Sequence, residues 1–392
     1  MIFKLAFRNV IGYGWRSVIN VFIIALVLVG LVWMISLWAS WINLAKTQQQ
    51  DWEYGSGTMR ARAYDPLDMF SWEKAYAPVP SEARPHIDSG LVVPVLFSPG
   101  ALYSHGRMTN VMIKGIPAAQ KVLKIPSATL ENHPDHSIPA LLGKAMAKSA
   151  RLQEGDIFTI RIKDAAGAFN TLDLTVAQVM DCPVPSLDVN TVWMDLEALR
   201  QAKDLPDRAT VLVLADSRLS SIPDRDFRYI DRSEFFADID QMVKTKAGGQ
   251  SFFFMMLIGL AMLAVFDTQA LAVFKRRKEI GTLSALGFTK GQIIRIFTLE
   301  GSIYVLLAML AGAVLGLPLF WYFGTHGLTL PGGSEGFGVQ GFDEPLKFVY
   351  PIHLILLTLV FVFGLTVFVS WLPARRISRL NPTDAIRGRD HA

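Results

Sequence analysis

The chain has 392 residues, of which 51% are hydrophobic and only 18% are charged, with a formal net charge of +4 and a sequence pI near 9.0. A soluble domain rarely carries so little charge, so the composition predicts membrane-spanning segments. The single cysteine, Cys182, excludes internal disulfides, and we interpret it as a partly buried structural thiol.

Four apolar stretches are long enough to cross about 30 Å of hydrocarbon, which takes about 20 helical residues. We expect membrane helices at residues 18–41, 252–274, 302–323 and 351–371. The first lies in an uncharged run over 17–45, longer than the apolar part of a secretory signal and without a small-residue cleavage pattern. We therefore interpret it as an uncleaved signal-anchor.

The distribution of basic residues predicts the orientation. Lys and Arg gather in the first sixteen residues, in 275–295 and after Trp371, whereas the segment 324–350 contains only Lys347. Basic flanks stay on the cytoplasmic side of a span, so we expect both termini in the cytoplasm and residues 46–250 outside. Because topology explains the basic excess, we expect no nucleic-acid partner.

The outer region reads as a mixed α/β domain held by its own core. The polar run 47–52 is expected to continue the first helix. Short β-rich pieces predict strands at 90–97, 111–115, 157–163, 171–179, 190–194 and 209–215, and helical patterns lie at 139–150, 195–202 and 233–244. In the first of these helices we expect Leu142, Ala145, Met146 and Ala150 on the buried face, followed by a turn at Gly155-Asp156.

Two features of the spans bear on packing or function. Asp267 lies inside the second predicted span, where an ionisable group is expensive. We interpret it as a structural polar contact between helices, with proton coupling as the alternative. Gly312 and Gly316 form a G-x-x-x-G pair in the third span, which either allows close helix packing or occurs by chance.

The segment 274–301, FKRRKEIGTLSALGFTKGQIIRIFTLEG, connects the second and third spans and opens with four cations. Ile280, Leu283 and Leu286 are spaced as one apolar edge of a helix, and Gly287 is suited to end it in the left-handed conformation. Thr289 and Gln292 then form a capping box, with Phe288 and Ile293 as its hydrophobic staple. The pattern predicts a short helix, a tight break and a second helix, a stiff part suited to receive force from a partner.

This connector resembles that of the FtsX/MacB/LolC–LolE group of ABC-transporter permeases, whose form is about R-R-x-E-I-G-x-L-x-A-L-G, then I, then E-G. The matching positions are Arg276, Arg277, Glu279, Ile280, Gly281, Leu283, Ala285, Leu286, Gly287, Ile293, Glu300 and Gly301.

Both ends of the chain resemble the same group. At the start the match lies in Ala6, Arg8, Asn9, Arg16 and Ser17, and at the end in Pro373, Ala374, Arg376, Pro382, Ala385, Ile386 and Arg387. The helix–Gly-Asp–strand pattern over 141–162 resembles the MacB-like extracytoplasmic core domain.

The expected fold class is therefore an α-helical membrane protein with four transmembrane helices and a mixed α/β extracytoplasmic domain inserted between helices 1 and 2. The expected division is a lead-in at 1–17, helix 1 at 18–45, the outer domain at 46–250, helix 2 at 251–274, the coupling segment at 275–300, helix 3 at 301–323, an external loop at 324–350, helix 4 at 351–372 and a cytoplasmic tail at 373–392.

Catalytic signatures are absent from the sequence. It holds no G-x-x-x-x-G-K-[ST] phosphate loop, and its glycine-rich stretch 331–338 lacks the lysine. His133 and His136 lie in a predicted solvated loop, so we expect no metal site. We expect a chain that is not an enzyme and holds no cofactor, with ATP bound and hydrolysed by a separate subunit.

The resemblance implies the permease subunit of an ABC transporter in a bacterial inner membrane, working with a dimer of ATPase subunits and a second permease copy or paralogue. The implied ATPase-coupling residues are Arg276, Arg277, Glu279, Ile280, Gly281, Leu283, Leu286 and Gly287. Our first hypothesis for the cargo is lipoprotein release, with a lipoprotein or a periplasmic adaptor as a further partner. The alternatives are a MacB-like exporter of peptides or amphiphiles, and an FtsX-type regulator of a cell-wall hydrolase.

Overall fold

A computed structural model describes residues 14–66, 68–131, 137–221, 225–329 and 345–377, together with positions 6, 8, 10 and 12. The chain divides into two compact units. The helical unit comprises Met1–Asn43, Met242–Leu328 and Pro345–Ala392, and the sheet unit comprises Leu44–Gln241 and Thr329–Glu344. Several sequence features lie outside the described residues: Asn9 of the lead-in, the His133–His136 loop, the glycine-rich stretch 331–338 and the tail from 378 onward.

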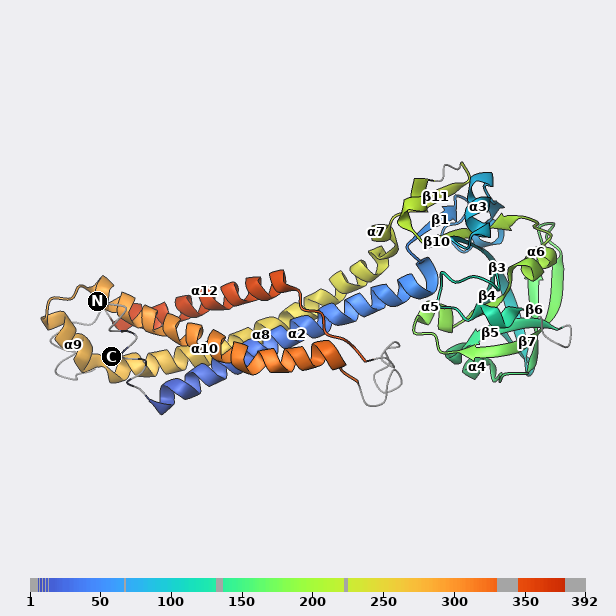
Figure 1. Cartoon of the computed structure of the whole chain (residues 1–392). Coiled ribbons are helices and arrows are strands. Elements are labelled where there is room, and N and C mark those ends of the chain that lie inside the picture. The colour runs from blue at the N-terminus through green and yellow to red at the C-terminus, as the bar shows by residue number, and fades with distance from the viewer. Residues whose placement is uncertain are drawn as a thin grey trace. The chain divides into compact units, whose positions relative to one another are not determined.

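Long helices make up the helical unit (Figure 1). They are α2 (Trp15–Gln49), α8 (Ala237–Lys275), α10 (Lys290–His326) and α12 (Ile352–Ile377), with the short α9 (Arg277–Ala285) before α10. Their packed sides form one apolar cluster, to which Leu28, Met262, Ala308 and Val362 each contribute from a different helix. The helices therefore hold together through a shared core.

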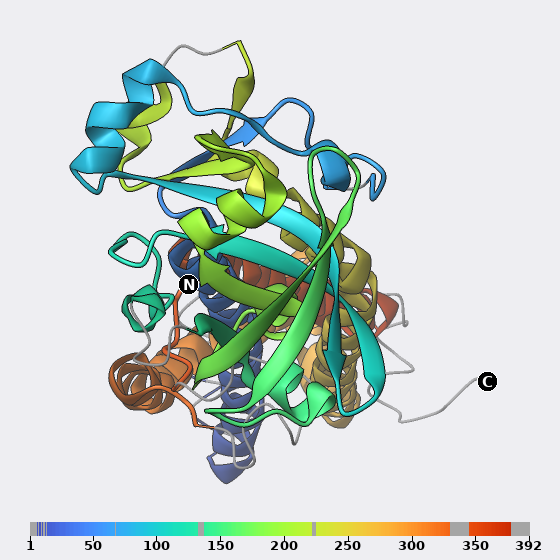
Figure 2. The same ribbon diagram turned by 90° about the vertical axis from the view of Figure 1, so that its right-hand side faces the viewer.

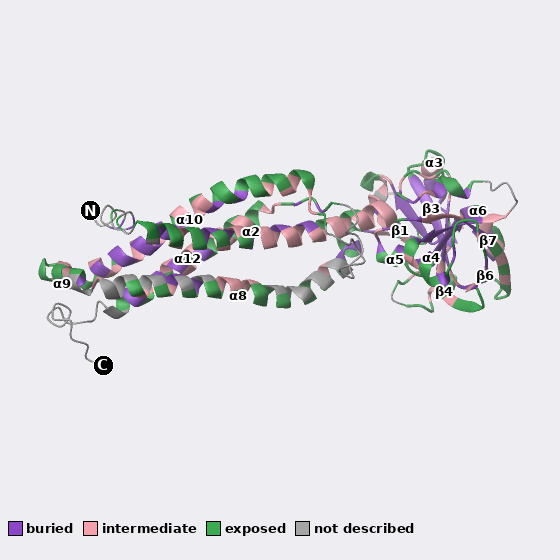
Figure 3. Ribbon diagram, turned by 90° about the horizontal axis from the view of Figure 1, so that it is seen from below, coloured by how far each residue is buried: buried purple, intermediate pink, exposed green. Residues whose placement is uncertain are grey.

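The same helices also carry apolar side chains on their outer sides. Leu310, Leu317 and Trp321 of α10 are exposed, as are Leu357 and Val360 of α12, and Figure 3 shows exposed residues running along these helices. Exposed apolar side chains along a whole helix are the pattern expected of a surface that faces lipid rather than water.

Three described helices are long and apolar enough to cross a membrane: Ser17–Tyr54, Lys290–His326 and Ile352–Arg375. They contain the first, third and fourth predicted spans. The second predicted span lies within α8, where the apolar stretch among described residues runs only over Ser251–Asp267. The structure therefore supports three of the four predicted spans by length and composition.

Gly312 lies where α10 meets α2. A Cβ atom there would be 3.5 Å from the backbone oxygen of Ala25 and 3.8 Å from a side-chain methyl of Val29. At Gly316 the atoms nearest to a Cβ belong to the ring of Phe320 in the same helix, the first at 2.8 Å. Gly312 thus allows α2 to approach α10 closely, whereas the space at Gly316 is taken by a side chain of α10 itself.

The sheet unit contains the β-strands. The larger sheet has the order β11-β1-β10-β3-β4-β8-β5-β7-β6, and the short strands β2 and β9 pair separately. The strand bounds are β1 Gly57–Ala61, β2 Ala77–Pro78, β3 Val92–Ser104, β4 Arg107–Ile116, β5 Ile138–Gly143, β6 Ile157–Lys163, β7 Phe169–Met180, β8 Thr191–Asp195, β9 Arg208–Ala209, β10 Val211–Leu214 and β11 Phe227–Ile230. Figure 2 looks onto these strands.

Strand β3 closes part of this sheet into a ring. Its first residues pair with β10, whereas Gly100–Tyr103 pair with β6 at the far end of the strand order. The ring therefore runs β3-β4-β8-β5-β7-β6 and back to β3. Inward positions of a closed sheet fill its interior with alternate side chains. The largest core cluster fits this, since Leu102, Ile113, Val192, Leu142 and Ile160 come from different strands of the ring.

Short helices complete the sheet unit. They are α3 (Arg84–Asp88), α4 (Lys144–Ala150), α5 (Pro185–Asp188), α6 (Leu196–Lys203) and α7 (Arg232–Phe235). After Gln49 the first long helix continues as a π-helix over Gln50–Tyr54, which confirms that the polar run 47–52 extends it. The predicted helix 195–202 is α6, and Asp195 caps it by accepting hydrogen bonds from the backbone of Glu197 and Ala198.

The predicted helix at 139–150 is wrong in its first half. Ile138–Gly143 form strand β5, which pairs with both β7 and β8, and only Lys144–Ala150 are helical. Leu142 is therefore a strand residue, while Met146 and Ala150 are buried on the helix as predicted. A short apolar run looks alike in a buried strand and a buried helix, so periodicity alone did not separate them.

The remaining strand predictions hold in position, and 157–163 matches β6 in its bounds. Gly155 takes a φ of +90°, which confirms the turn predicted at Gly155-Asp156, before strand β6. Strands β1 and β11 were not predicted. The predicted helix 233–244 is interrupted at Phe236, between α7 and α8.

Cys182 is buried with 5% exposure, and its Sγ lies 3.7 Å from the backbone oxygen of Val184. Burial raises the pKa of this thiol to about 12. A thiol that stays protonated is a poor nucleophile, so the structural interpretation of Cys182 stands.

Candidate functional site

The connector between α8 and α10 consists of the short helix α9, a tight turn and the capped start of α10. Helix α9 ends at Ala285, and Gly287 follows with a φ of +91°. The backbone N–H of Phe288 donates to the carbonyl of Leu283 at 3.1 Å. This is the hydrogen bond of a Schellman motif, in which glycine takes the left-handed position without a Cβ clash.

The next helix begins with the predicted capping box. Thr289 Oγ1 accepts from the backbone N–H of Gln292 at 3.4 Å, and Gln292 Oε1 accepts from the backbone N–H of Thr289 at 2.9 Å. The two bonds satisfy helix donors that otherwise lack partners. Helix α10 then continues without a break through the third predicted span, so the connector is a rigid start to that helix.

Arg276 joins the two helices of the connector. Its Nε donates to Glu279 Oε2 at 2.6 Å, and its Nη1 donates to Glu300 Oε2 at 2.9 Å. Its guanidinium also lies 5.1 Å from the ring centre of Phe297. The Arg276 side chain is 11% exposed and that of Glu300 only 2%. Because a charge buried without its partner is expensive, this pair strongly favours one arrangement of α9 on α10.

An apolar cluster supports the same arrangement. Ile280 of α9 packs with Ile293 and Phe297 of α10 and with Ala374 of α12, and Phe288 packs against them. The predicted staple between Phe288 and Ile293 is part of this cluster. The connector thus has its own small core in addition to the Arg276–Glu300 pair.

The predicted apolar edge of α9 does not form one surface. Ile280 is 7% exposed, Leu283 is half-buried and Leu286 is 77% exposed. Three residues fall about 60° short of a full helical turn, so side chains six positions apart, such as Ile280 and Leu286, point about 120° away from each other. Glu279, Thr282 and Leu286 are all exposed, and their spacing of three and four residues places them on one side.

The other predicted residues take different positions. Gly281 is buried, Arg277 opens α9, and Asp267 is exposed on α8. Among described residues, Asp267 makes no hydrogen bond or ion pair, so the predicted polar contact between helices is not seen for it. Sequence reasoning matched Glu300 only as a motif letter, although a lone carboxylate entering a long apolar helix signals a buried partner.

The described part of the chain contains no group of three or more His, Cys, Asp or Glu side chains arranged to hold a metal ion.

A family model matches the part of the chain that contains the connector. Residues 251–382 match the family model described as FtsX-like permease C-terminal. This part of the chain is similar to the C-terminal segment of FtsX-like permeases. It contains the connector, so the resemblance drawn from Arg276–Gly301 is confirmed.

Curated relatives cover different shares of the chain. The lipoprotein-releasing system transmembrane protein LolC of Xylella fastidiosa (strain 9a5c) is 23% identical over 140 residues, which are 34% of this chain and 33% of that protein. LolC of Neisseria meningitidis serogroup B is 21% identical over 327 residues, covering 75% of this chain and 77% of its own length. The match to the first relative thus spans about a third of it, whereas the second match extends beyond the FtsX-like segment.

A solved structure aligns with about half of the chain. The periplasmic region of MacB from Actinobacillus actinomycetemcomitans covers 48% of this chain and 94% of its own, at 14% identity and a TM-score of 0.31.

Proposed function

We propose that the chain is the membrane subunit of an ABC transporter and that α9 receives motion from a separate ATPase subunit. The observation that carries this proposal is the connector itself. Its inner side is fixed to α10 by the Arg276–Glu300 pair, while Glu279, Thr282 and Leu286 remain exposed. A helix that is rigidly backed and exposed on its other side transmits a push to the next helix with little loss.

The exposed stripe is the proposed docking surface. Leu286 is a large apolar side chain with 77% of its surface exposed, and such residues anchor protein contacts when they enter a partner's pocket. Glu279 supplies a charge beside it. In this scheme Ile280, Gly281 and Leu283 support the helix from within, and Arg276 positions it.

The cytoplasmic location of the connector follows from its basic residues and the positive-inside rule. With that orientation both termini are cytoplasmic and the sheet unit lies outside the inner membrane. The ATPase would work as a dimer, matched by two permease copies or by a copy and a paralogue. This chain contributes no phosphate loop of its own.

Lipoprotein release or export is the leading proposal for the cargo, since the relatives described above are named for lipoprotein release. A MacB-like exporter of peptides or amphiphiles is the second candidate. An FtsX-type regulator of a cell-wall hydrolase is the third, and the large outer region makes it the weakest of the three.

Affinity purification of the tagged full chain in a mild detergent tests the proposal. We expect an ATPase with a G-x-x-x-x-G-K-[ST] motif to co-purify, and a bound acylated protein would select lipoprotein release. The absence of any ATPase would overturn the transporter assignment.

The docking stripe is tested with Leu286→Asp. We expect this variant to lose the ATPase while keeping its thermal unfolding curve, because the Leu286 side chain is 77% exposed. Met108→Asp is the matched control, since Met108 is 58% exposed on β4 of the sheet unit. ATPase recovery equal to that of the control would show that the stripe is not the docking surface.

A further inference from the structure

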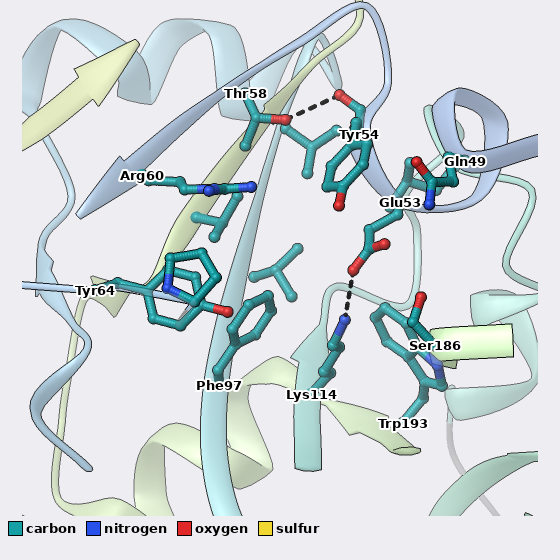
Figure 4. Close-up of a pocket in the computed structure, with 15 residues that line it drawn as sticks. Gln49, Glu53, Tyr54, Thr58, Arg60, Tyr64, Phe97, Lys114, Ser186 and Trp193 are labelled. Atoms are coloured by element: carbon teal, nitrogen blue, oxygen red, sulfur yellow. Dashed lines mark hydrogen bonds and ion pairs between the residues drawn. The ribbon is translucent and has the colours of Figure 1, made fainter. Parts of the chain in front are cut away.

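The sheet unit contains a pocket of about 260 Å³ that is separate from the connector (Figure 4). The π-helix that follows α2 forms one side of it through Glu53 and Tyr54. Strands β1, β3, β4, β8 and β10, helix α5 and the loops that carry Tyr64 and Leu123 line the other sides. The side chains that line it and matter here are Arg60, Tyr64, Phe97, Lys114 and Trp193.

The walls of the pocket are largely aromatic. Tyr64 and Phe97 meet edge to face with their ring centres 5.5 Å apart. Lys114 Nζ lies 4.7 Å from the ring centre of Phe97 and 5.3 Å from that of Trp193. These planar surfaces suit a flat or branched apolar group.

The charges of the lining leave one positive charge in excess. Lys114 and Glu53 form an ion pair at 3.0 Å, with side chains 8% and 18% exposed. The third charged residue of the lining, Arg60, is half-buried and lies over the ring of Phe235. Its guanidinium makes no ion pair or hydrogen bond to any residue that the structure describes. In Figure 4 Arg60 reaches in from the side opposite Lys114 and Glu53.

Neutral donors accompany this cation. Burial raises the pKa of Tyr64 to about 12, so its phenol keeps its proton at physiological pH. Trp193 is 1% exposed, and its Nε1 has no acceptor among described residues. The buried side-chain oxygen of Gln49, which also lines the pocket, is an acceptor without a donor among the described residues. Buried polar atoms normally have partners, so an exception in a pocket wall points to a bound group.

We propose that this pocket binds a small carboxylate whose body is an aromatic or branched apolar group. Arg60 is the anchor for the carboxylate because a guanidinium pairs with it in a planar, bidentate way. Tyr64 is the additional donor, and the aromatic walls hold the body. The proposal goes beyond the transport function and does not depend on it.

Other ligand classes fit less well. A cationic ligand would face Arg60 without a free acid, because Glu53 is already paired with Lys114. A phosphate monoester carries about two negative charges and would meet only one cation in excess. A lipid acyl chain needs more room, since even drug-sized ligands occupy pockets of about 300–1,000 Å³.

Isothermal titration calorimetry on the purified full chain in lipid nanodiscs tests this with two probes, 3-phenylpropionate and its neutral counterpart 3-phenylpropionamide. They share the phenyl body and differ only in the charged group. We expect saturable binding of the carboxylate, at least about tenfold tighter than that of the amide, since hydrogen bonds to charged groups contribute about 1.5–3 kcal/mol. Equal affinities, or no saturable heat with the carboxylate, would overturn the proposal.

Variants assign the anchor. Arg60→Gln should weaken carboxylate binding about tenfold and leave amide binding unchanged, and Tyr64→Phe should weaken it severalfold while keeping the ring. The matched control is Arg62→Gln, because Arg62 is exposed two residues away and does not line the pocket. If Arg60→Gln lowers the unfolding temperature, Tyr64→Phe carries the test. Unchanged carboxylate affinity in both variants would contradict the assignment.

Discussion

The connector and the sheet unit each keep a basic side chain away from water, and they stabilise it differently. Arg276 is tied to the buried carboxylate of Glu300. Lys203, at the end of α6, is 2% exposed, and its Nζ donates to the hydroxyl of Ser98 at 3.1 Å. It forms no ion pair with a described carboxylate, and burial lowers its pKa to about 8, although Glu73 and Asp164 act in the opposite direction.

The paired charge of Arg276 stabilises the packing around it, whereas the buried charge of Lys203 lowers the stability of the fold. A guanidinium stays charged at any physiological pH, so its site must provide a partner. An amine gives up its proton when buried, so a lysine is tolerated at a cost in stability that depends on pH. Removing the two cations should therefore change stability in opposite directions.

The largest effect is expected at Arg276. Arg276→Met removes the guanidinium that pairs with the buried Glu300 carboxylate and should destabilise the connector by about 3–5 kcal/mol. Hydrogen exchange of the backbone amides in α9 and the first turns of α10, measured on the full chain, should rise strongly.

Two further variants sharpen this result. Arg295→Gln, at an exposed position of α10, is the control and should exchange as the native chain does. The double variant Arg276→Met/Glu300→Leu removes both charges and should recover much of the protection. Native exchange rates in Arg276→Met would refute the structural role of the pair.

The opposite sign is expected at Lys203. Lys203→Met should stabilise the sheet unit at pH 7 by about 1–3 kcal/mol, because a charged amine is no longer buried. The folded-state pKa near 8 lies below the ordinary value of 10.5. The penalty is therefore fully present below pH 8 and fades as the pH rises toward the unfolded value.

The gain should accordingly be larger at pH 7 than at pH 10. Denaturant unfolding of the full chain, followed through exchange of the β7 amides, measures it, with the exposed Lys121→Met as control. A loss of stability at pH 7, or a gain that does not shrink at pH 10, would show that the charged amine of Lys203 does not destabilise the folded state.

A smaller effect is expected at the cap of α10. Thr289→Ala removes one hydrogen bond of the capping box and should cost about 1 kcal/mol, with faster exchange confined to the start of α10. Thr325→Ala, near the other end of the same helix, is the control, because its hydroxyl bonds only within the last turns. An effect that spreads to Arg276 and α9 would mean that the cap, rather than the ion pair, organises the connector.

The smallest effect is expected at Asp267, a carboxylate that is exposed on α8. Asp267→Asn should leave both unfolding and the transport rate of the reconstituted complex nearly unchanged, because no described partner loses a contact. A large loss of transport with native stability would favour the alternative of proton coupling.

Local chemistry made much of the connector predictable. Gly287, Thr289 and Gln292 act through backbone hydrogen bonds with residues a few positions away. Such motifs can be recognised from the local sequence alone. The apolar spans were predictable for a similar reason, since their length and composition are properties of one segment. The helix at 139–150 failed because the pairing of β5 with β7 and β8 overrides local preference.

The pocket and the buried lysines Lys114 and Lys203 could not be predicted, because their surroundings come from distant parts of the chain. Lys114 and Glu53 are far apart in the chain and meet only because the π-helix lies near β4. Lys203 and Ser98 are brought together in the same way by α6 and β3. Nothing in either local sequence marks these residues as buried.

The sequence by itself determined the apolar helices, the capped connector and its resemblance to FtsX-like permeases, because each is encoded by neighbouring residues or by a contiguous motif. Only the tertiary structure decided which face of α9 stays exposed, which cation has a partner and where a pocket forms. Those properties depend on contacts between residues distant in the chain, and a helix face becomes inner or outer only when another element packs against it.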